Sequence, residues 1–222
     1  MRTEIRHSPS FAVARLLLDG GETVRVQSGA MAVHSEGVEL EVTIDGGLVK
    51  SLKRSVMGGV GLFASNYKAP KAGGWVDVAA VLPGDAFSVD VDGEYILTRG
   101  CFLACGSGLQ LDAEFTEYGA LVGDDDGILI RVTGTGTLVA AAFGALDRHQ
   151  LAEGEVITVD TGHLVSYSPT VSIESRRAAA GGGLIKSAKS GELTVFDITG
   201  PGEVLTQSRN PKEFASWAKS QK

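Results

Sequence analysis

Three stretches of the chain repeat one arrangement of glycines and strand-forming residues, and this repeat limits the possible folds more than any other feature. The stretches open with Gly-Glu turns at Gly21, Gly93 and Gly154. Each reaches a second glycine seven or eight residues later, and a strand pattern starts nine residues after that second glycine. Such self-similarity is typical of chains that pack several copies of one small unit. The sequence therefore predicts three related units of about sixty to seventy residues.

Each unit is expected to consist of short β-strands joined by turns that contain glycine. Val, Ile, Leu and Thr gather in short runs, and residues 38–42 alternate apolar and polar side chains. That alternation places one face of a sheet against a core and the other in water. A unit of this size buries too little apolar surface to be stable alone, so we expect three units to share a core in a pseudo-threefold arrangement.

The predicted organisation is a single all-β domain followed by a short helix. The domain covers residues 1–209, and its three repeats span roughly 10–83, 84–146 and 147–209. Residues 210–222 are expected to form a C-terminal helix and tail.

The start of this helix is well marked in the sequence. Asn210 is a favoured cap residue, Pro211 suits the first helical position, and Glu213 suits the first turn. Phe214, Trp217 and Ala218 then fall on one face. We expect that face to cover an open end of the β core or a neighbouring subunit.

A basic stretch interrupts the β pattern from about Leu48 to Tyr67. Residues 46–76 contain no Asp or Glu and carry five cations, so that the rest of a chain with net charge −7 carries about −12. A helical arrangement of residues 48–56 would separate an apolar side from a basic side. Basic residues beside apolar ones suit an anionic membrane surface or an acidic protein. The predicted contact residues are Lys50, Lys53, Arg54, Leu62, Phe63, Lys68 and Lys71. Alternatively, a short helix there caps the sheet and keeps its basic side in water.

The two cysteines are expected to be buried free thiols. Cys101 and Cys105 lie four residues apart in a strand-like segment, which separates them by roughly 13 Å at about 3.3 Å per residue. That distance is too long for a disulfide bond between them.

No catalytic or cofactor-binding motif is recognisable, and we expect a non-enzymatic protein without a cofactor. Residues 106–108 read as a hairpin turn, and residues 124–127 lack the alternating ligands of a helix-loop-helix calcium site. Residues 134–136 lack the lysine of a phosphate-binding loop. The four histidines are scattered, so a metal site would need ligands from distant strands. The negative net charge argues against nucleic acid as a partner.

Several motifs resemble the mitochondrial-biogenesis family called altered inheritance of mitochondria twenty-four. The matching segments are residues 58–63, 74–78, 82–84, 159–167 and 200–209. The resemblance implies a double-stranded β-helix type of unit, similar to the tryptophan RNA-binding attenuation protein, present several times in one chain. It brings no catalytic residues. Eukaryotic members of the family lie in mitochondria and are connected with inner-membrane organisation.

The expected function is that of a non-catalytic binding or scaffolding protein. We expect a cytoplasmic bacterial form, peripheral to a membrane, because no signal or transit sequence precedes the first strand. Its predicted partners are further copies of itself, with a trimer as the expected homo-oligomer, and an anionic membrane surface or an acidic protein. The alternative is a small-molecule-binding β module that holds its ligand between repeats.

Overall fold

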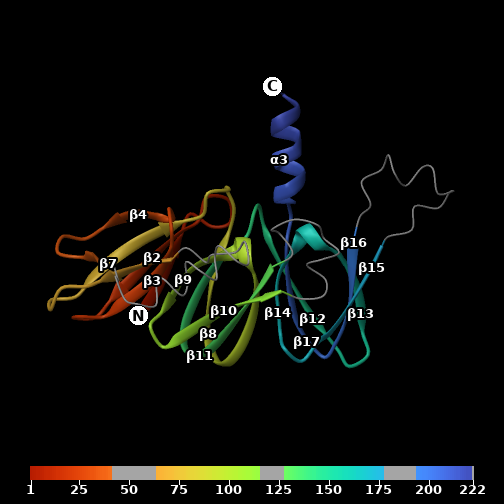
Figure 1. Cartoon of the computed structure of the whole chain (residues 1–222), viewed down its shortest axis with the longest axis horizontal. Coiled ribbons are helices and arrows are strands. Elements are labelled where there is room, and N and C mark those ends of the chain that lie inside the picture. Colours follow the sequence, from red (N-terminus) through yellow and green to blue (C-terminus); the bar gives the residue numbers. More distant parts are fainter. Residues whose placement is uncertain (42–63, 116–127, 178–193, 222) are drawn as a thin grey trace.

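The chain is almost entirely β-structure in the computed structural model, which describes residues 1–41, 64–115, 128–177 and 194–221. Three groups of strands follow one another along the long axis, in the order of the sequence (Figure 1). Both the all-β fold and the short C-terminal helix are confirmed.

The elements of each group follow in chain order. The first group contains β1 (Arg2–Arg6), β2 (Val13–Leu18), β3 (Thr23–Gln27), β4 (Met31–His34), β5 (Glu39–Glu41), β6 (Ala64–Lys68) and β7 (Gly74–Ala79). The second contains β8 (Ala86–Thr98), the 3-10 turn η1 (Arg99–Cys101), β9 (Phe102–Gly106), β10 (Leu109–Phe115) and β11 (Ile128–Ala141). The third contains β12 (Leu146–Leu151), β13 (Val156–Asp160), the 3-10 turn η3 (Thr161–His163), β14 (Leu164–Tyr167), β15 (Ser172–Arg177), β16 (Thr194–Thr199) and β17 (Gly202–Gln207). The helix α3 (Pro211–Ser220) follows.

The three groups use the same antiparallel pairing scheme. In the first, β7 lies between β2 and β4, and β6 lies between β3 and β5. In the third, β17 lies between β12 and β14, and β16 lies between β13 and β15. In the second, the long strands β8 and β11 pair with each other, and β11 also pairs with β9 and β10. The pseudo-threefold arrangement around a shared core and the likeness to the attenuation protein stay predictions.

Strand pairing also joins neighbouring groups. β3 of the first group pairs with β9 of the second, and β8 of the second pairs with β14 of the third. These two junctions merge parts of all three groups into one ten-stranded sheet, flanked by a four-stranded sheet (β1-β2-β7-β4) and a three-stranded sheet (β13-β16-β15). The junctions make the groups parts of one continuous body.

The Gly-Glu pairs have two different roles. Glu22 and Glu155 each accept a hydrogen bond from the backbone N–H three residues earlier, at 2.9 and 2.8 Å, which closes a tight turn. The turn expected at Gly93 is wrong, because this glycine lies inside β8. It has φ of 105° and faces Gly134, with φ of 113°, in β11. Both strands continue through a conformation that suits glycine, so the second unit has one long strand pair at the place where a turn was expected.

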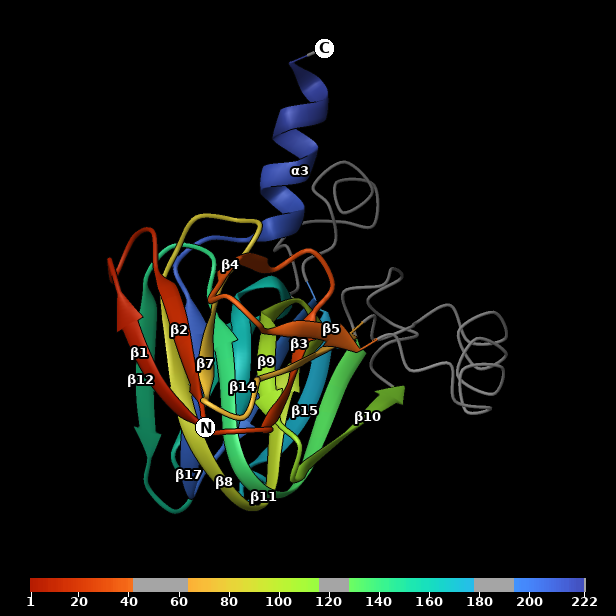
Figure 2. The ribbon, with the colours of Figure 1, turned by 90° about the vertical axis from the view of Figure 1, so that its left-hand side faces the viewer.

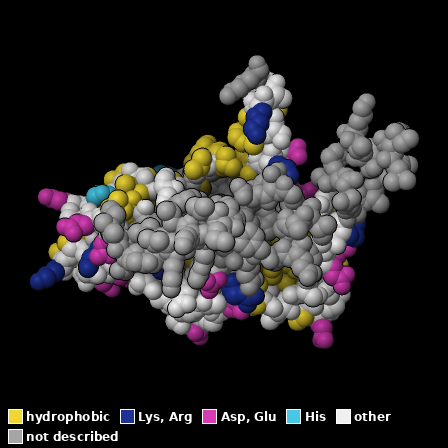
Figure 3. Space-filling view, in the orientation of Figure 1, with side chains coloured by type: hydrophobic (Ala, Val, Ile, Leu, Met, Phe, Trp, Pro, Cys, Tyr) yellow, Lys and Arg dark blue, Asp and Glu magenta, His cyan; other side chains and the backbone are white. Residues whose placement is uncertain are grey.

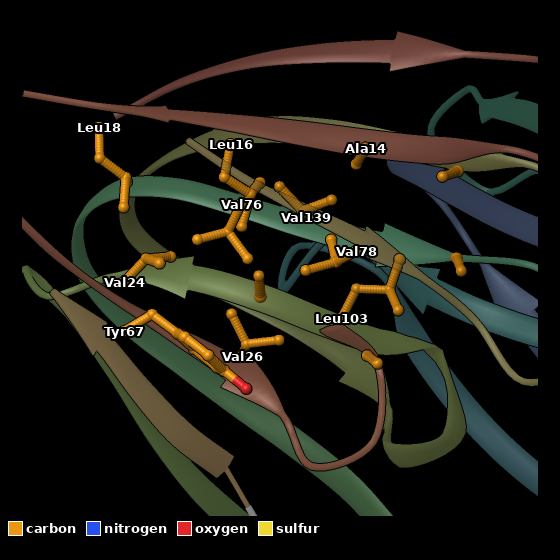
Figure 4. Close-up of a cluster of buried hydrophobic side chains, with 14 of the residues drawn as sticks. Ala14, Leu16, Leu18, Val24, Val26, Tyr67, Val76, Val78, Leu103 and Val139 are labelled. Carbon is orange, nitrogen blue, oxygen red and sulfur yellow. The ribbon is translucent and has the colours of Figure 1, made fainter. Parts of the chain in front are cut away.

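The core lies between the sheets and is built from several elements at once. Leu16 of β2 and Val76 of β7 lie beside Val24 of β3, together with Leu103 and Val139 from the second group (Figure 4). All five side chains are fully buried. The alternating pattern of these strands therefore buries one face of each sheet, as the sequence predicts.

The basic stretch departs from its prediction where the structure describes it. Residues 64–67 belong to strand β6, which pairs with β3 and β5, so the break in the β pattern is shorter than expected. The proposed helical residues 48–56 lie outside the described residues. The hairpin turn predicted at residues 106–108 is wrong. β9 and β10 both run antiparallel along β11, with Cys105 opposite Leu138 and Leu109 opposite Gly134, so the chain does not reverse direction between them.

Candidate interaction surfaces

Only two of the seven predicted contact residues lie in the described part of the chain. Lys68 is on β6, where its Nζ lies 3.2 Å from a carboxylate oxygen of Glu41 on β5. Lys71 is exposed in the turn between β6 and β7. Lys50, Lys53, Arg54, Leu62 and Phe63 lie outside the described residues. The basic surface thus stays a prediction.

The structure reveals an exposed apolar surface around the start of α3. It is formed by Phe143, Phe214 and Trp217, and we call it the helix surface. Phe11 and Val81 are further exposed apolar side chains on the connections described below. Val81 is 89% exposed and Phe11 71%. The Phe143 and Phe214 rings lie edge to face, with centroids 5.4 Å apart, and the Phe214 and Trp217 centroids are 5.9 Å apart. Figure 3 shows hydrophobic side chains both on α3 and at its base.

Connections between the strand groups bring these residues together. The Ala12 N–H donates to the Gly84 carbonyl, and the Gly144 N–H donates to the Pro83 carbonyl. The Arg209 N–H donates to the Phe143 carbonyl. Segments from four distant parts of the sequence thereby meet at one side of the body. Sequence periodicity reveals only the shared face of Phe214 and Trp217 on α3, because the neighbouring apolar residue Phe143 comes from a loop.

The helix itself projects from the body instead of covering it. Its residues after Pro211 are exposed, and Trp217 is 59% exposed (Figure 2). The predicted cap is confirmed: the Asn210 side chain accepts hydrogen bonds from the backbone N–H groups of Lys212 and Glu213, and Pro211 begins the helix. The face that was expected to cover the β core is instead open in the single chain.

Two segments that carry the family resemblance anchor the helix. The Asn210 side chain donates to Asp160 Oδ1 at 3.2 Å, and the same oxygen accepts the Gly162 N–H at 2.9 Å. Gln207, which is buried, donates from Nε2 to the Gly162 carbonyl at 2.9 Å. A Cβ atom at Gly162 would lie 2.2 Å from the Asn210 amide nitrogen. Glycine is needed here because the base of the helix approaches the backbone so closely.

Three further exposed apolar side chains lie on strands at sheet edges. Val33 of β4 and Leu40 of β5 are both 53% exposed, and Val156 of β13 is 55% exposed; β5 ends the ten-stranded sheet. β4 forms one edge of the four-stranded sheet, and β13 forms one edge of the three-stranded sheet. Edge strands carry unpaired backbone groups that can pair with another chain.

A charged cluster on the first group has a structural role. Asp77 is buried and accepts two hydrogen bonds from Arg15, at 2.8 and 2.9 Å, and one from Arg6, at 2.6 Å. The Arg15 guanidinium also stacks on Trp75, 3.8 Å from the ring centroid. The hydrogen bonds from Arg15, followed by those from Arg6, lower the pKa of Asp77. These contacts tie β1, β2 and β7 together.

Both cysteines are buried free thiols, as predicted. Burial raises the pKa of Cys101 to about 12 and that of Cys105 to about 11, so both stay protonated at neutral pH. We therefore expect Ellman's reagent at pH 8 to leave both thiols unmodified in the folded protein and to titrate two thiols after unfolding in guanidinium chloride. A rapid reaction with the folded protein would contradict the buried positions.

The described ranges contain neither a cluster of metal ligands nor a helix that could span a membrane. Within residues 1–41, 64–115, 128–177 and 194–221, no three His, Cys, Asp or Glu side chains gather closely enough to hold a metal ion. The acidic residues 124–126 lie outside these ranges. None of the helices in the described part of the chain is long and apolar enough to span a membrane.

The fold and its surfaces define an all-β protein with a projecting C-terminal helix. The family model named Mitochondrial biogenesis AIM24 matches residues 3–209, and the chain belongs to this family. An uncharacterized protein of Streptococcus pyogenes serotype M6 is 29% identical over 228 residues, covering 99% of this chain and 90% of that protein. The crystal structure of a Streptococcus pyogenes protein is similar with a TM-score of 0.81 and 27% identity, covering 100% of this chain and 99% of that one.

Proposed function

We propose that the protein is a non-catalytic scaffold that binds an anionic membrane surface through the helix surface. The observation that carries this proposal is the exposure of Phe214 and Trp217 on a helix that stands away from the body. Isolated helices of about ten residues are marginally stable in water. An apolar surface that covers Phe214 and Trp217 would stabilise α3 and remove their rings from water.

The side chains around α3 suit the boundary between lipid headgroups and acyl chains. Trp and Phe favour this region, and Lys and Arg beside them attract anionic lipids. Residues 209–222 contain four cationic side chains and one acidic side chain, although the whole chain has a net charge of −7. The predicted basic residues 50–71 would add further cations. An acidic protein partner is the alternative that the experiment must separate.

Vesicle sedimentation with the full chain tests the proposal. We expect binding to vesicles that contain phosphatidylserine or phosphatidylglycerol and little binding to phosphatidylcholine vesicles. Each cation near such a surface contributes about 1 kcal/mol. Replacing Lys50, Lys53 and Arg54 with Gln should therefore weaken binding roughly 100-fold. Replacing Phe214 and Trp217 with Ser should weaken it at least tenfold without unfolding the body, because both side chains are exposed.

Leu40→Ser is the matched control, because Leu40 is exposed and apolar but lies on β5, outside the helix surface. It should bind like the unmodified protein. Equal binding to neutral and anionic vesicles, or full binding by the Phe214→Ser/Trp217→Ser variant, would contradict the proposal. Capture of a protein partner that depends on the same residues, without vesicle binding, would favour the acidic-protein alternative.

A further inference from the structure

Among the described residues, β4 and β13 each end a sheet, whereas the equivalent strands of the other groups have a neighbour on that side. β9 and β14 occupy the position of β4 in their own groups, and they pair with β3 and β8 of the preceding group. β13 occupies the position of β3 in the third group, but no strand follows it in the three-stranded sheet order. β4 and β13 lie at opposite ends of the long axis, so they cannot pair within one chain (Figure 1).

The two internal junctions share one register. Arg25 faces Cys105 at the first junction, and Ile96 faces Tyr167 at the second. Arg25 and Ile96 each lie four positions before the second glycine of their own unit, Gly29 or Gly100. Cys105 and Tyr167 each lie five positions after the second glycine of the next unit, Gly100 or Gly162. The strand register is therefore the same at both junctions between units.

The same register, applied to β13 of one copy and β4 of another, specifies how the two copies would pair. It places Thr158 opposite His34 and Val159 opposite Val33 in an antiparallel pair of β13 with β4. Neither strand needs to change its existing partner, because β13 pairs with β16 on its other side and β4 pairs with β7.

Burial supports the need for such a neighbour. Every residue of β9 is buried, as are the first three residues of β14. In β4 the last three residues are exposed. Ala104 and Ser166, which hold the position of Val33, are fully buried, whereas Val33 is 53% exposed. The exposure of β4 thus follows from the missing neighbour and not from a polar sequence.

The composition of the three hydrophobic clusters also indicates that the third group has room for a neighbour. The first cluster is completed by Leu103 and Val139 of the second group, and the second by Val165 and Leu205 of the third. Among the described residues, the third cluster contains buried side chains from the third group alone. It is the unit that a following copy would complete.

We infer that copies of this chain assemble head to tail, with β13 of one copy paired to β4 of the next. Such a heterologous contact produces a ring when the rotation between copies closes and a filament when it does not. The inference does not depend on membrane binding, since it concerns other residues and a different partner. The predicted trimer would be one closed form of this assembly.

Sedimentation velocity without lipid tests the assembly. The full chain is expected to sediment as a multiple of its 23.1 kDa mass. Val33→Asp blocks the β4 edge, and Thr158→Lys, which changes the exposed residue opposite His34, blocks the β13 edge. Each variant alone should be a monomer, with association at least tenfold weaker. An equimolar mixture retains one intact edge of each kind. It should form a dimer with one copy of each variant and nothing larger.

Leu40→Asp is the matched control, because Leu40 is apolar and as exposed as Val33, at 53%, but lies on β5, which belongs to neither paired edge. Its mass should equal that of the unmodified chain. The dimer in the mixture also shows that both variants are folded. A monomeric unmodified chain, an unchanged mass of Val33→Asp, or a mixture that stays monomeric would overturn the inference. Vesicle binding that persists in these monomeric variants would leave the proposed function intact.

Discussion

Replacing Phe102 with Ala is expected to lower the free energy of unfolding by about 3–5 kcal/mol, the usual cost of deleting a buried phenyl ring. Phe102 begins β9, is 1% exposed, and packs in the second hydrophobic cluster. The neighbouring strands are fixed by pairing with β11, so they cannot close the resulting cavity completely. Chemical denaturation of the full chain measures the change.

Phe11→Ala provides the matched control for this substitution. It deletes the same ring from a site that is mostly exposed, so we expect a change of at most about 0.5 kcal/mol. Comparable losses at both positions would show that the second cluster is not the core that stabilises the molecule.

Replacing Asp77 with Asn is expected to lower the free energy of unfolding by about 1–3 kcal/mol. The amide keeps the shape of the side chain but removes the charge that accepts hydrogen bonds from Arg15 and Arg6. Both guanidinium groups are partly exposed, so water offsets part of the loss. Asp197→Asn is the control, because its ion pair with Arg176 is on the surface, and we expect no resolved change in Tm.

The effect of Asp77→Asn should depend on pH in one direction. The pKa of Asp77 is lowered in the folded protein, chiefly by Arg15, so the unfolded chain binds its proton more readily. The carboxylate therefore stabilises the fold above the unfolded pKa of about 3.9, and this contribution is lost as the pH falls through the lower folded pKa. The difference in stability between the two proteins should be constant from about pH 7 to pH 5 and should shrink below about pH 4. A difference that grows on acidification would contradict the assignment.

The all-β fold could be predicted because short alternating strands and regularly placed glycines are local signals. The cap at Asn210 is equally local, and the structure confirms it. The continuation of β8 through Gly93 could not be predicted, because a Gly-Glu pair suits both a turn and a bend inside a long strand.

The long connection that contains the basic residues 50–54 has counterparts in the other two groups. Residues 42–63 join β5 to β6, but residues 116–127 join β10 to β11 and residues 178–193 join β15 to β16 at the corresponding places. What sets the first connection apart is its basic charge and not its presence. The charge of a segment can be read from the sequence. The equivalence of these three connections can be recognised only once the partners of the strands that they join are known.

The candidate surfaces were only partly accessible to sequence reasoning. The shared face of Phe214 and Trp217 was predicted, but the exposure of that face depends on the direction in which α3 leaves the body. The two edges carry ordinary strand sequences, so only the order of the sheets shows that β4 and β13 have no second neighbour among the described strands. A small-molecule site between repeats stays a prediction.

The fluorescence of Trp217 tests the central claim, membrane binding by the helix surface, most directly. The chain has two tryptophans, so Trp75→Phe leaves Trp217 as the sole reporter. We expect its emission to shift to shorter wavelength when anionic vesicles are added and to stay unchanged with neutral vesicles, because the exposed ring leaves water on binding. Unchanged emission at saturating anionic lipid would contradict the account.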